Sequence, residues 1–139
     1  MELKIESRKI LKEKSRAKSQ ITFDEDFNVP DAKPDAGRLI QNKGRIIMDD
    51  VRLTDGKGIL TGNLQVDILY VGEERGIVSS LTAKLPFEET LNLKNIINGD
   101  KMCLKWEIED LTIRLIHSRK LNIKALVTFC ATVDETEQI

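Results

Sequence analysis

The chain has 139 residues, with 22 lysines and arginines against 23 aspartates and glutamates and a net charge of −1. This balance argues against the strongly basic surface on which nucleic-acid binding depends, and no apolar run reaches the roughly 18 residues that a membrane span requires. The first residues contain no apolar signal region, so we expect a protein made in the cytoplasm without a signal peptide. The length fits one domain.

The N-terminal segment alternates weakly between apolar and polar residues. Leu3 and Ile5 suggest one strand, and residues 21–29 suggest a second, because apolar side chains recur there at alternate positions. The composition of residues 8–18 also fits a helix. Both interpretations of that stretch stay open.

Residues 35–42 carry the one clear signal for a helix. Pro34 fixes the backbone at the entry, and Asp35 places a carboxylate near the free N–H groups of a first turn. Leu39 and Ile40 would face the core, and Gly44 lies where a C-terminal cap belongs. We predict a helix of about two turns over this range.

Strict alternation, which is typical of half-buried strands, follows further along the chain. Asp55-Gly56 predicts a hairpin turn before the first alternating run, and residues 72–76 predict a turn between the two runs. The apolar residues expected to face the core are Leu60, Leu64, Val66, Ile68 and Tyr70 in the first run and Ile77, Leu81, Ala83, Leu85 and Phe87 in the second.

The last third predicts a long hairpin with a β-bulge. Apolar residues occupy even positions from Met102 to Ile108 and odd positions from Leu111 to Leu115, whereas residues 121–133 keep odd positions throughout. With a three-residue loop at residues 117–119, both faces stay in register only if one extra residue is present near Glu109-Asp110. The predicted pairs are Leu115 with Leu121, Ile113 with Ile123, Ile108 with Val127, Trp106 with Phe129 and Leu104 with Ala131.

The same register separates the two cysteines of the chain. Cys103 falls opposite Thr132 and Cys130 opposite Lys105, which makes the cysteines diagonal neighbours at roughly 7–8 Å. A disulfide needs Cα atoms within about 7 Å and favourable side-chain directions. We therefore predict two free thiols, and cross-linking between subunits stays open.

The titratable residues form no pattern that is typical of an enzyme. His117, the single histidine, falls in a predicted surface turn, and neighbouring carboxylates on a strand point to opposite faces. Acidic residues between 24 and 35 could ligate a hard cation such as calcium, but turn and capping roles explain them. Few aromatic residues remain for a nucleic-acid or sugar platform. We expect no enzyme activity, no metal, no cofactor and no nucleic acid, and binding through protein surfaces and sheet edges.

Four segments share an order and spacing with a known family: VPDAKPDAGRLI at 29–40, GNLQVDILY at 62–70, LPFE at 85–88 and SRKLNI at 118–123. They resemble the SPOCS domain, which is found in spore-envelope proteins of clostridia and other Gram-positive bacteria, often beside a LysM module. The resemblance covers nearly the whole chain. We accordingly expect one SPOCS-like domain over residues 1–133 and a polar tail over residues 134–139, with no LysM segment after Val133.

The strand pattern predicts an all-β fold, an antiparallel sandwich or distorted barrel of about seven strands with one short helix. The resemblance implies a non-enzymatic structural protein of the spore coat or exosporium that lies in the spore surface layers. It implies self-assembly into a homo-oligomer and contacts with protein partners of the envelope. The alternative is a module that binds cell-wall glycan or peptidoglycan. The candidate interaction residues are Asp31, Lys33, Pro34, Asp35, Arg38, Ser118, Arg119 and Lys120.

Overall fold

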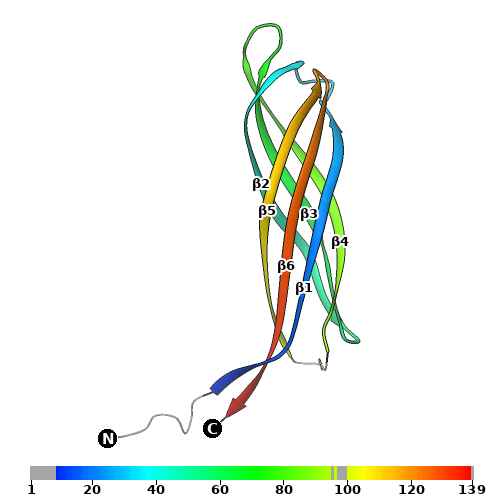
Figure 1. Ribbon diagram of the computed structural model, residues 1–139, viewed down its shortest axis with the longest axis vertical. Coiled ribbons are helices and arrows are strands. Elements are labelled where there is room, and N and C mark those ends of the chain that lie inside the picture. Colours follow the sequence, from blue (N-terminus) through cyan, green and yellow to red (C-terminus); the bar gives the residue numbers. More distant parts are fainter. Residues whose placement is uncertain (1–8, 95, 97–99, 139) are drawn as a thin grey trace, which may run out of the picture.

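The computed structural model describes residues 9–94, 96 and 100–138, and it is built from six long strands (Figure 1). None of the described residues belongs to a helix, so this part of the chain contains no helix that could cross a membrane. The strands are β1 (Lys9–Asn28), β2 (Ala36–Thr54), β3 (Lys57–Gly72), β4 (Val78–Asn92), β5 (Lys101–His117) and β6 (Lys120–Gln138).

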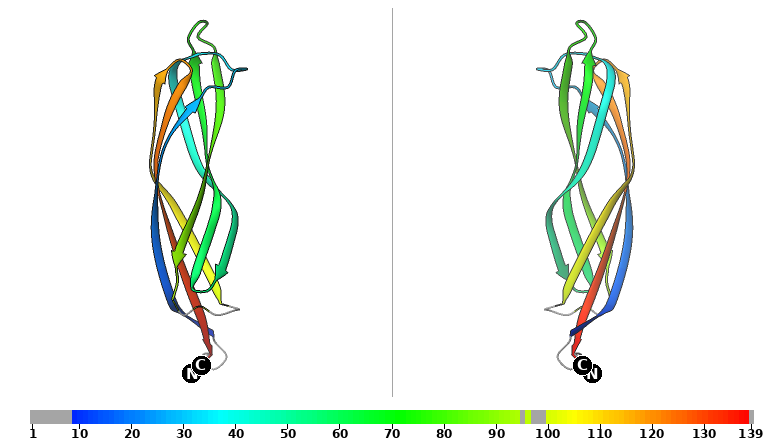
Figure 2. Two further views of the ribbon diagram at one scale, coloured as in Figure 1. Left: turned by 90° about the vertical axis from the view of Figure 1, so that its right-hand side faces the viewer. Right: turned by 90° about the vertical axis from the view of Figure 1, so that its left-hand side faces the viewer.

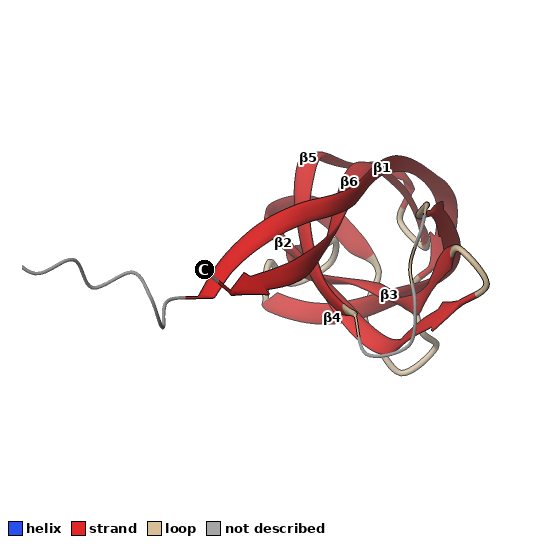
Figure 3. Cartoon of the chain, turned by 90° about the horizontal axis from the view of Figure 1, so that it is seen from below, coloured by secondary structure: helices blue, strands red, loops and turns tan. Residues whose placement is uncertain are grey.

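The strands form two antiparallel sheets of three strands each, which pack face to face. One sheet has the order β1-β6-β5 and the other the order β2-β3-β4. The chain passes from one sheet to the other between β1 and β2 at one end of the molecule and between β4 and β5 at the opposite end (Figure 2). The two layers are elongated (Figure 2). No strand of one sheet pairs with a strand of the other, so the layers do not close into a barrel (Figure 3). The predicted all-β sandwich is confirmed, with six strands in place of the expected seven.

The predicted helix over residues 35–42 is wrong, because these residues begin strand β2. A helix of about two turns is marginal by itself, whereas in β2 the backbone pairs with β3, with Leu39 opposite Tyr70 and Gly44 opposite Val66. Gly44 is therefore not a helix cap. A Cβ at this position would lie 2.8 Å from Cδ2 of Leu111 on β5, so glycine allows β5 to pack closely against β2.

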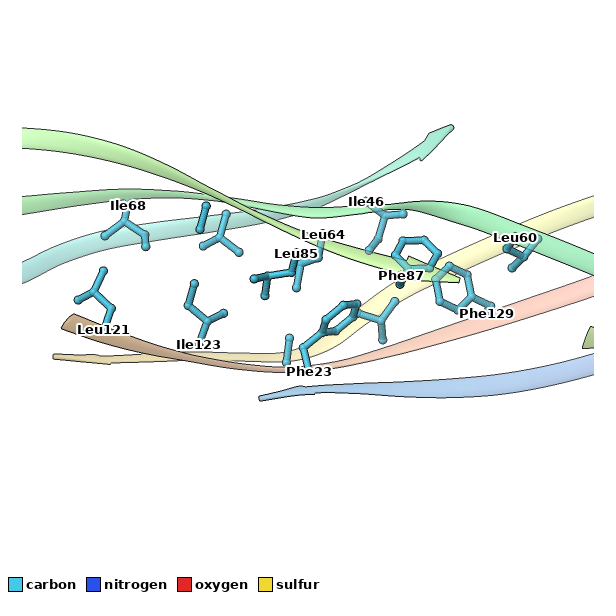
Figure 4. Close-up of a cluster of buried hydrophobic side chains, with 14 of the residues drawn as sticks. Phe23, Ile46, Leu60, Leu64, Ile68, Leu85, Phe87, Leu121, Ile123 and Phe129 are labelled. Carbon is cyan, nitrogen blue, oxygen red and sulfur yellow. The ribbon is translucent and has the colours of Figure 1, made fainter. Parts of the chain in front are cut away.

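The core lies between the two central strands, β3 and β6 (Figure 4). In β3 the predicted alternation is confirmed, with buried residues separated by half-buried or exposed ones. Phe87 on β4 contacts Phe23 on β1 with ring centroids 6.2 Å apart, and Phe129 on β6 at 5.3 Å. The side chains that are completely or almost completely buried include Leu60, Leu64, Val66, Ile68, Tyr70, Leu121, Ile123, Val127, Phe129 and Val133.

The predicted hairpin register between β5 and β6 is confirmed. All five predicted pairs occur, and the register shifts between Ile108 and Asp110, where the bulge was expected. The connecting loop is shorter than predicted. His117 pairs with Lys120, so Ser118-Arg119 form a two-residue turn, and a second register shift lies between Leu115 and His117.

The remaining local predictions have mixed outcomes. The Asp55-Gly56 turn is confirmed, and both residues have positive φ (37° and 77°), as a two-residue hairpin turn of this hand requires. Residues 9–28 form one strand, so the helical interpretation of residues 8–18 is wrong over its described part. The strand suggested by Leu3 and Ile5 lies outside the described residues. Strand β6 continues through the segment assigned to a tail, and its backbone pairs with β1 as far as Gln138.

Candidate functional site

Segments that are far apart in the sequence meet at one end of the sandwich, shown at the top of Figure 1. They are the connection between β1 and β2 (residues 29–35), the turn between β5 and β6 (residues 118–119) and the loop between β3 and β4 (residues 73–77). Antiparallel pairing brings them together, because β1, β3 and β5 all end here and β2, β4 and β6 all begin here. We call this region the Arg119 end.

The side chain of Arg119 organises this end of the molecule. Its Nη1 atom donates hydrogen bonds to the carbonyl oxygen of Lys33 at 2.7 Å and to Oδ1 of Asp35 at 3.0 Å. Its Nη2 atom donates to the carbonyl oxygens of Val29 at 3.0 Å and Pro30 at 2.9 Å. The planar, fork-shaped guanidinium can satisfy several acceptors of one loop at once. A single side chain from the β5–β6 turn therefore fixes the β1–β2 connection.

Backbone hydrogen bonds hold the same connection to both sheets. The N–H of Val29 donates to the carbonyl oxygen of Arg119, and the N–H of Ala36 donates to that of Ser118, each at 2.8 Å. On the other side, the N–H of Glu73 donates to the carbonyl oxygen of Asp35 at 2.8 Å. The connection thus lies between the two sheets with bonds to both.

Tyr70 supports the connection from the core. Its ring is completely buried on β3, and its hydroxyl donates a hydrogen bond to the carbonyl oxygen of Pro34 at 2.9 Å. Pro34 itself has no N–H and a restricted backbone, which suits a short connection held by its carbonyl groups. These contacts give the Arg119 end a defined shape.

A cleft of about 580 Å³ opens beside this connection. Ile77 and Val78 lie on its edge and are 60% and 58% exposed, the highest values among the large apolar side chains that the structure describes. Lys33 and Arg75 also line it, and neither forms an ion pair within the described part of the chain. The remaining lining residues are Pro34, Asp35, Gly72, Glu74, Ser79 and Arg119.

The eight predicted interaction residues divide into three groups. Lys33, Pro34, Asp35 and Arg119 line the cleft. Asp31 is fully exposed beside the cleft, with its Oδ1 atom 4.0 Å from Nη2 of Arg119. Ser118 contributes its backbone carbonyl oxygen, which accepts a hydrogen bond from the β1–β2 connection. The other two lie outside the cleft and are Arg38, which is exposed on β2, and Lys120, which pairs with Asp26 at 3.7 Å.

Sequence reasoning missed the apolar edge of the cleft. Ile77 was expected to face the core, yet it lies in the β3–β4 loop and is exposed. Two adjacent apolar residues, Ile77 and Val78, cannot both face inward from a strand, and this break in the alternation was the available signal. Glu74 and Arg75 carried no signal, because only the fold places them beside Lys33.

Two of the acidic residues that were considered as cation ligands, Asp24 and Asp26, accept hydrogen bonds from one protein side chain. The Nδ2 atom of Asn122 donates to Oδ1 of Asp24 at 2.9 Å and to Oδ1 of Asp26 at 3.0 Å. Oδ1 of Asn122 is buried and has no hydrogen-bond partner among the residues that the structure describes. Among the described residues, no three histidine, cysteine or carboxylate side chains lie close enough to hold a metal ion.

Both cysteines are free and lie on the outer face of the β1-β6-β5 sheet. Cys103 is exposed and pairs with Thr132, and Cys130 is half-buried and pairs with Lys105. The side chain of His117 is exposed, and its Nδ1 atom accepts a hydrogen bond from the N–H of Arg119 at 3.1 Å.

Fold and site together define an all-β sandwich domain with a partly apolar cleft at one end. Residues 35–116, more than half of the chain, match the model of the family described as SipL, SPOCS domain. The chain therefore belongs to the SipL SPOCS domain family, which associates it with sporulation. No curated protein and no solved structure matches the chain.

Proposed function

We propose that this protein is a non-enzymatic structural component of the bacterial spore envelope, in the coat or exosporium, that acts through protein–protein contacts and self-association. Its membership in the SPOCS family supports the link to the spore. The observation that carries the proposal is the pair Ile77 and Val78, exposed on the edge of a cleft whose other side is fixed by Arg119. Exposed apolar side chains that lie together with polar residues around them are typical of protein interaction sites.

The charges in the cleft define the kind of partner that it fits. Lys33 and Arg75 have no ion-pair partner within the described part of the chain, whereas Asp35 is paired with Arg119. Glu74 is the remaining carboxylate in the cleft. A partner segment with an aliphatic or aromatic side chain and neighbouring carboxylates would complement both the apolar edge and the free cations.

The test is the location of the protein in sporulating cells of the bacterium that produces it. We expect a fluorescent fusion of the full chain to accumulate around the developing spore, and the double variant Ile77→Asp/Val78→Asp to stay diffuse. Leu69→Asp is the matched control, because Leu69 is also an exposed apolar residue (37%) but lies outside the cleft. Circular dichroism must first show that all variants are folded.

Three results would contradict the proposal. A wild-type fusion that stays diffuse throughout sporulation would refute the envelope role. A folded Ile77→Asp/Val78→Asp variant with wild-type location would refute the cleft as the contact site. Retention of the purified protein on peptidoglycan sacculi, lost in the same double variant, would favour the glycan-binding alternative.

A further inference from the structure

The two edge strands β2 and β5 lie side by side along one long side of the sandwich (Figures 1 and 3). Each is the outer strand of its sheet, so its outward backbone N–H and C=O groups have no strand partner within the described structure. Six large apolar side chains on these strands are 37–50% exposed, namely Ile40, Ile47, Val51, Leu53, Trp106 and Ile116. We call this side the β2/β5 seam.

The opposite long side, between β1 and β4, differs in both respects. Apart from Val78 at the Arg119 end, no large apolar side chain described on β1 or β4 is strongly exposed. Pro86 lies in the middle of β4, opposite Asn63 of β3. Proline has no N–H, so it interrupts the row of donors that an added strand would need. The edge of β4 is therefore protected against pairing, and the β2/β5 seam is the long side on which exposed apolar side chains gather.

Charges of opposite sign face outward on the two strands of the seam. Lys43 and Arg45 lie on β2, and Glu107 and Asp110 lie on β5. All four are exposed, and none forms an ion pair within the described part of the chain. The charges on the two strands lie at the same level along the long axis of the sandwich. This follows from the position of Gly44 between Lys43 and Arg45, because a Cβ at Gly44 would approach side chains of β5 on both sides of its bulge.

The register leaves uninterrupted strand on both sides of the seam at this height. In β2, residues 41–48 pair with β3 without a shift, and in β5 residues 110–115 do so with β6. Beyond the bulge, residues 101–108 form a second regular stretch. The charged residues of both edge strands therefore lie in segments whose pairing is regular.

We propose that the seam is the interface of a symmetric dimer of this chain, with a two-fold axis parallel to the long axis of the sandwich. Such an axis places β2 of one copy beside β5 of the other, antiparallel and at equal height. Lys43 and Arg45 of each copy then face Glu107 and Asp110 of the other, so the charges match twice. Each three-stranded sheet continues into the partner's sheet, and Trp106 becomes buried. This dimer specifies the self-association in the proposed function and rests on it.

Charge exchange between two variants tests this geometry. We expect sedimentation velocity to show a dimer of the full chain that weakens as the salt concentration rises. The variants Lys43→Glu/Arg45→Glu and Glu107→Lys/Asp110→Lys should each dissociate at least about tenfold more readily, because like charges then face each other twice. An equimolar mixture of the two should restore the wild-type affinity, because both contacts of the mixed dimer again join opposite charges.

Lys84→Glu/Glu88→Lys on β4 is the control, because it also reverses two exposed charges but lies on the opposite long side of the sandwich. It should leave the dimer unchanged. A wild-type chain that sediments as a monomer up to millimolar concentration overturns the dimer, as does a mixture that stays monomeric. These results are distinguishable from failure of the cleft, because Ile77→Asp/Val78→Asp should remain dimeric while it loses its position at the spore.

Discussion

Arg119→Ala is the most informative single change at the Arg119 end. The four hydrogen bonds of the guanidinium disappear, and three of the acceptors that lose their donor are backbone carbonyl oxygens. The side chain is 32% exposed, so water replaces part of each bond. A value of about 0.5–1 kcal/mol per bond is therefore appropriate, below the value for a buried charged group. The expected loss in the free energy of unfolding is about 2–4 kcal/mol.

Urea denaturation followed by circular dichroism measures this loss directly, and the midpoint of thermal unfolding should fall by about 6–12 °C. Arg119→Lys keeps the charge but not the fork, so it should recover less than half of the lost stability. Arg75→Ala is the control, because Arg75 lies on the same cleft and forms no hydrogen bond or ion pair within the described residues. If Arg119→Ala unfolds like the wild type, or lysine restores full stability, the reasoning is wrong.

Three further substitutions test the contacts of β3 and the turn that precedes it. Gly62→Ala should lower the free energy of unfolding, measured in urea, by about 2 kcal/mol or more, because the added Cβ would overlap the backbone carbonyl oxygen of Ile47. A neutral result would contradict this close approach. Tyr70→Phe should cost about 1 kcal/mol, because the carbonyl oxygen of Pro34 loses its donor, and an unchanged melting temperature would argue against that bond. Gly56→Ala should cost about 1 kcal/mol, because φ is 77° there, and calorimetry showing no loss would be inconsistent with a left-handed turn.

The β5–β6 hairpin could be predicted from the sequence because its constraints are local and numerous. The parity of apolar residues changes between Ile108 and Leu111 and does not change on the partner strand, so one extra residue had to be present. The pairing of Trp106 with Phe129 followed from that count, and the structure contains it. The exposure of Trp106 did not follow, because it depends on β5 being an edge strand, which is a property of the whole sheet.

The start of β2 shows why local signals failed elsewhere. Pro34, Asp35 and Gly44 satisfy the rules for a helix with caps, and each residue has a different role in the structure. Pro34 offers its carbonyl oxygen to Tyr70, Asp35 pairs with Arg119, and Gly44 makes room for Leu111. All three contacts join residues distant in the sequence, so no local pattern contained them.

The family match and the folding unit do not coincide, and this bears on the site. Residues 35–116 contain the whole β2-β3-β4 sheet but only β5 of the other sheet. Strand β6 supplies the side chains that cover β3, so the matched segment without it would leave that face open to water. The cleft divides in the same way, since Asp35 and Ile77 lie inside the match and Arg119 lies outside it. Arg119 also donates a hydrogen bond to the carbonyl oxygen of Val29. The cleft is therefore complete only when β6 pairs with β1 and brings the end of β1 beside the matched segment.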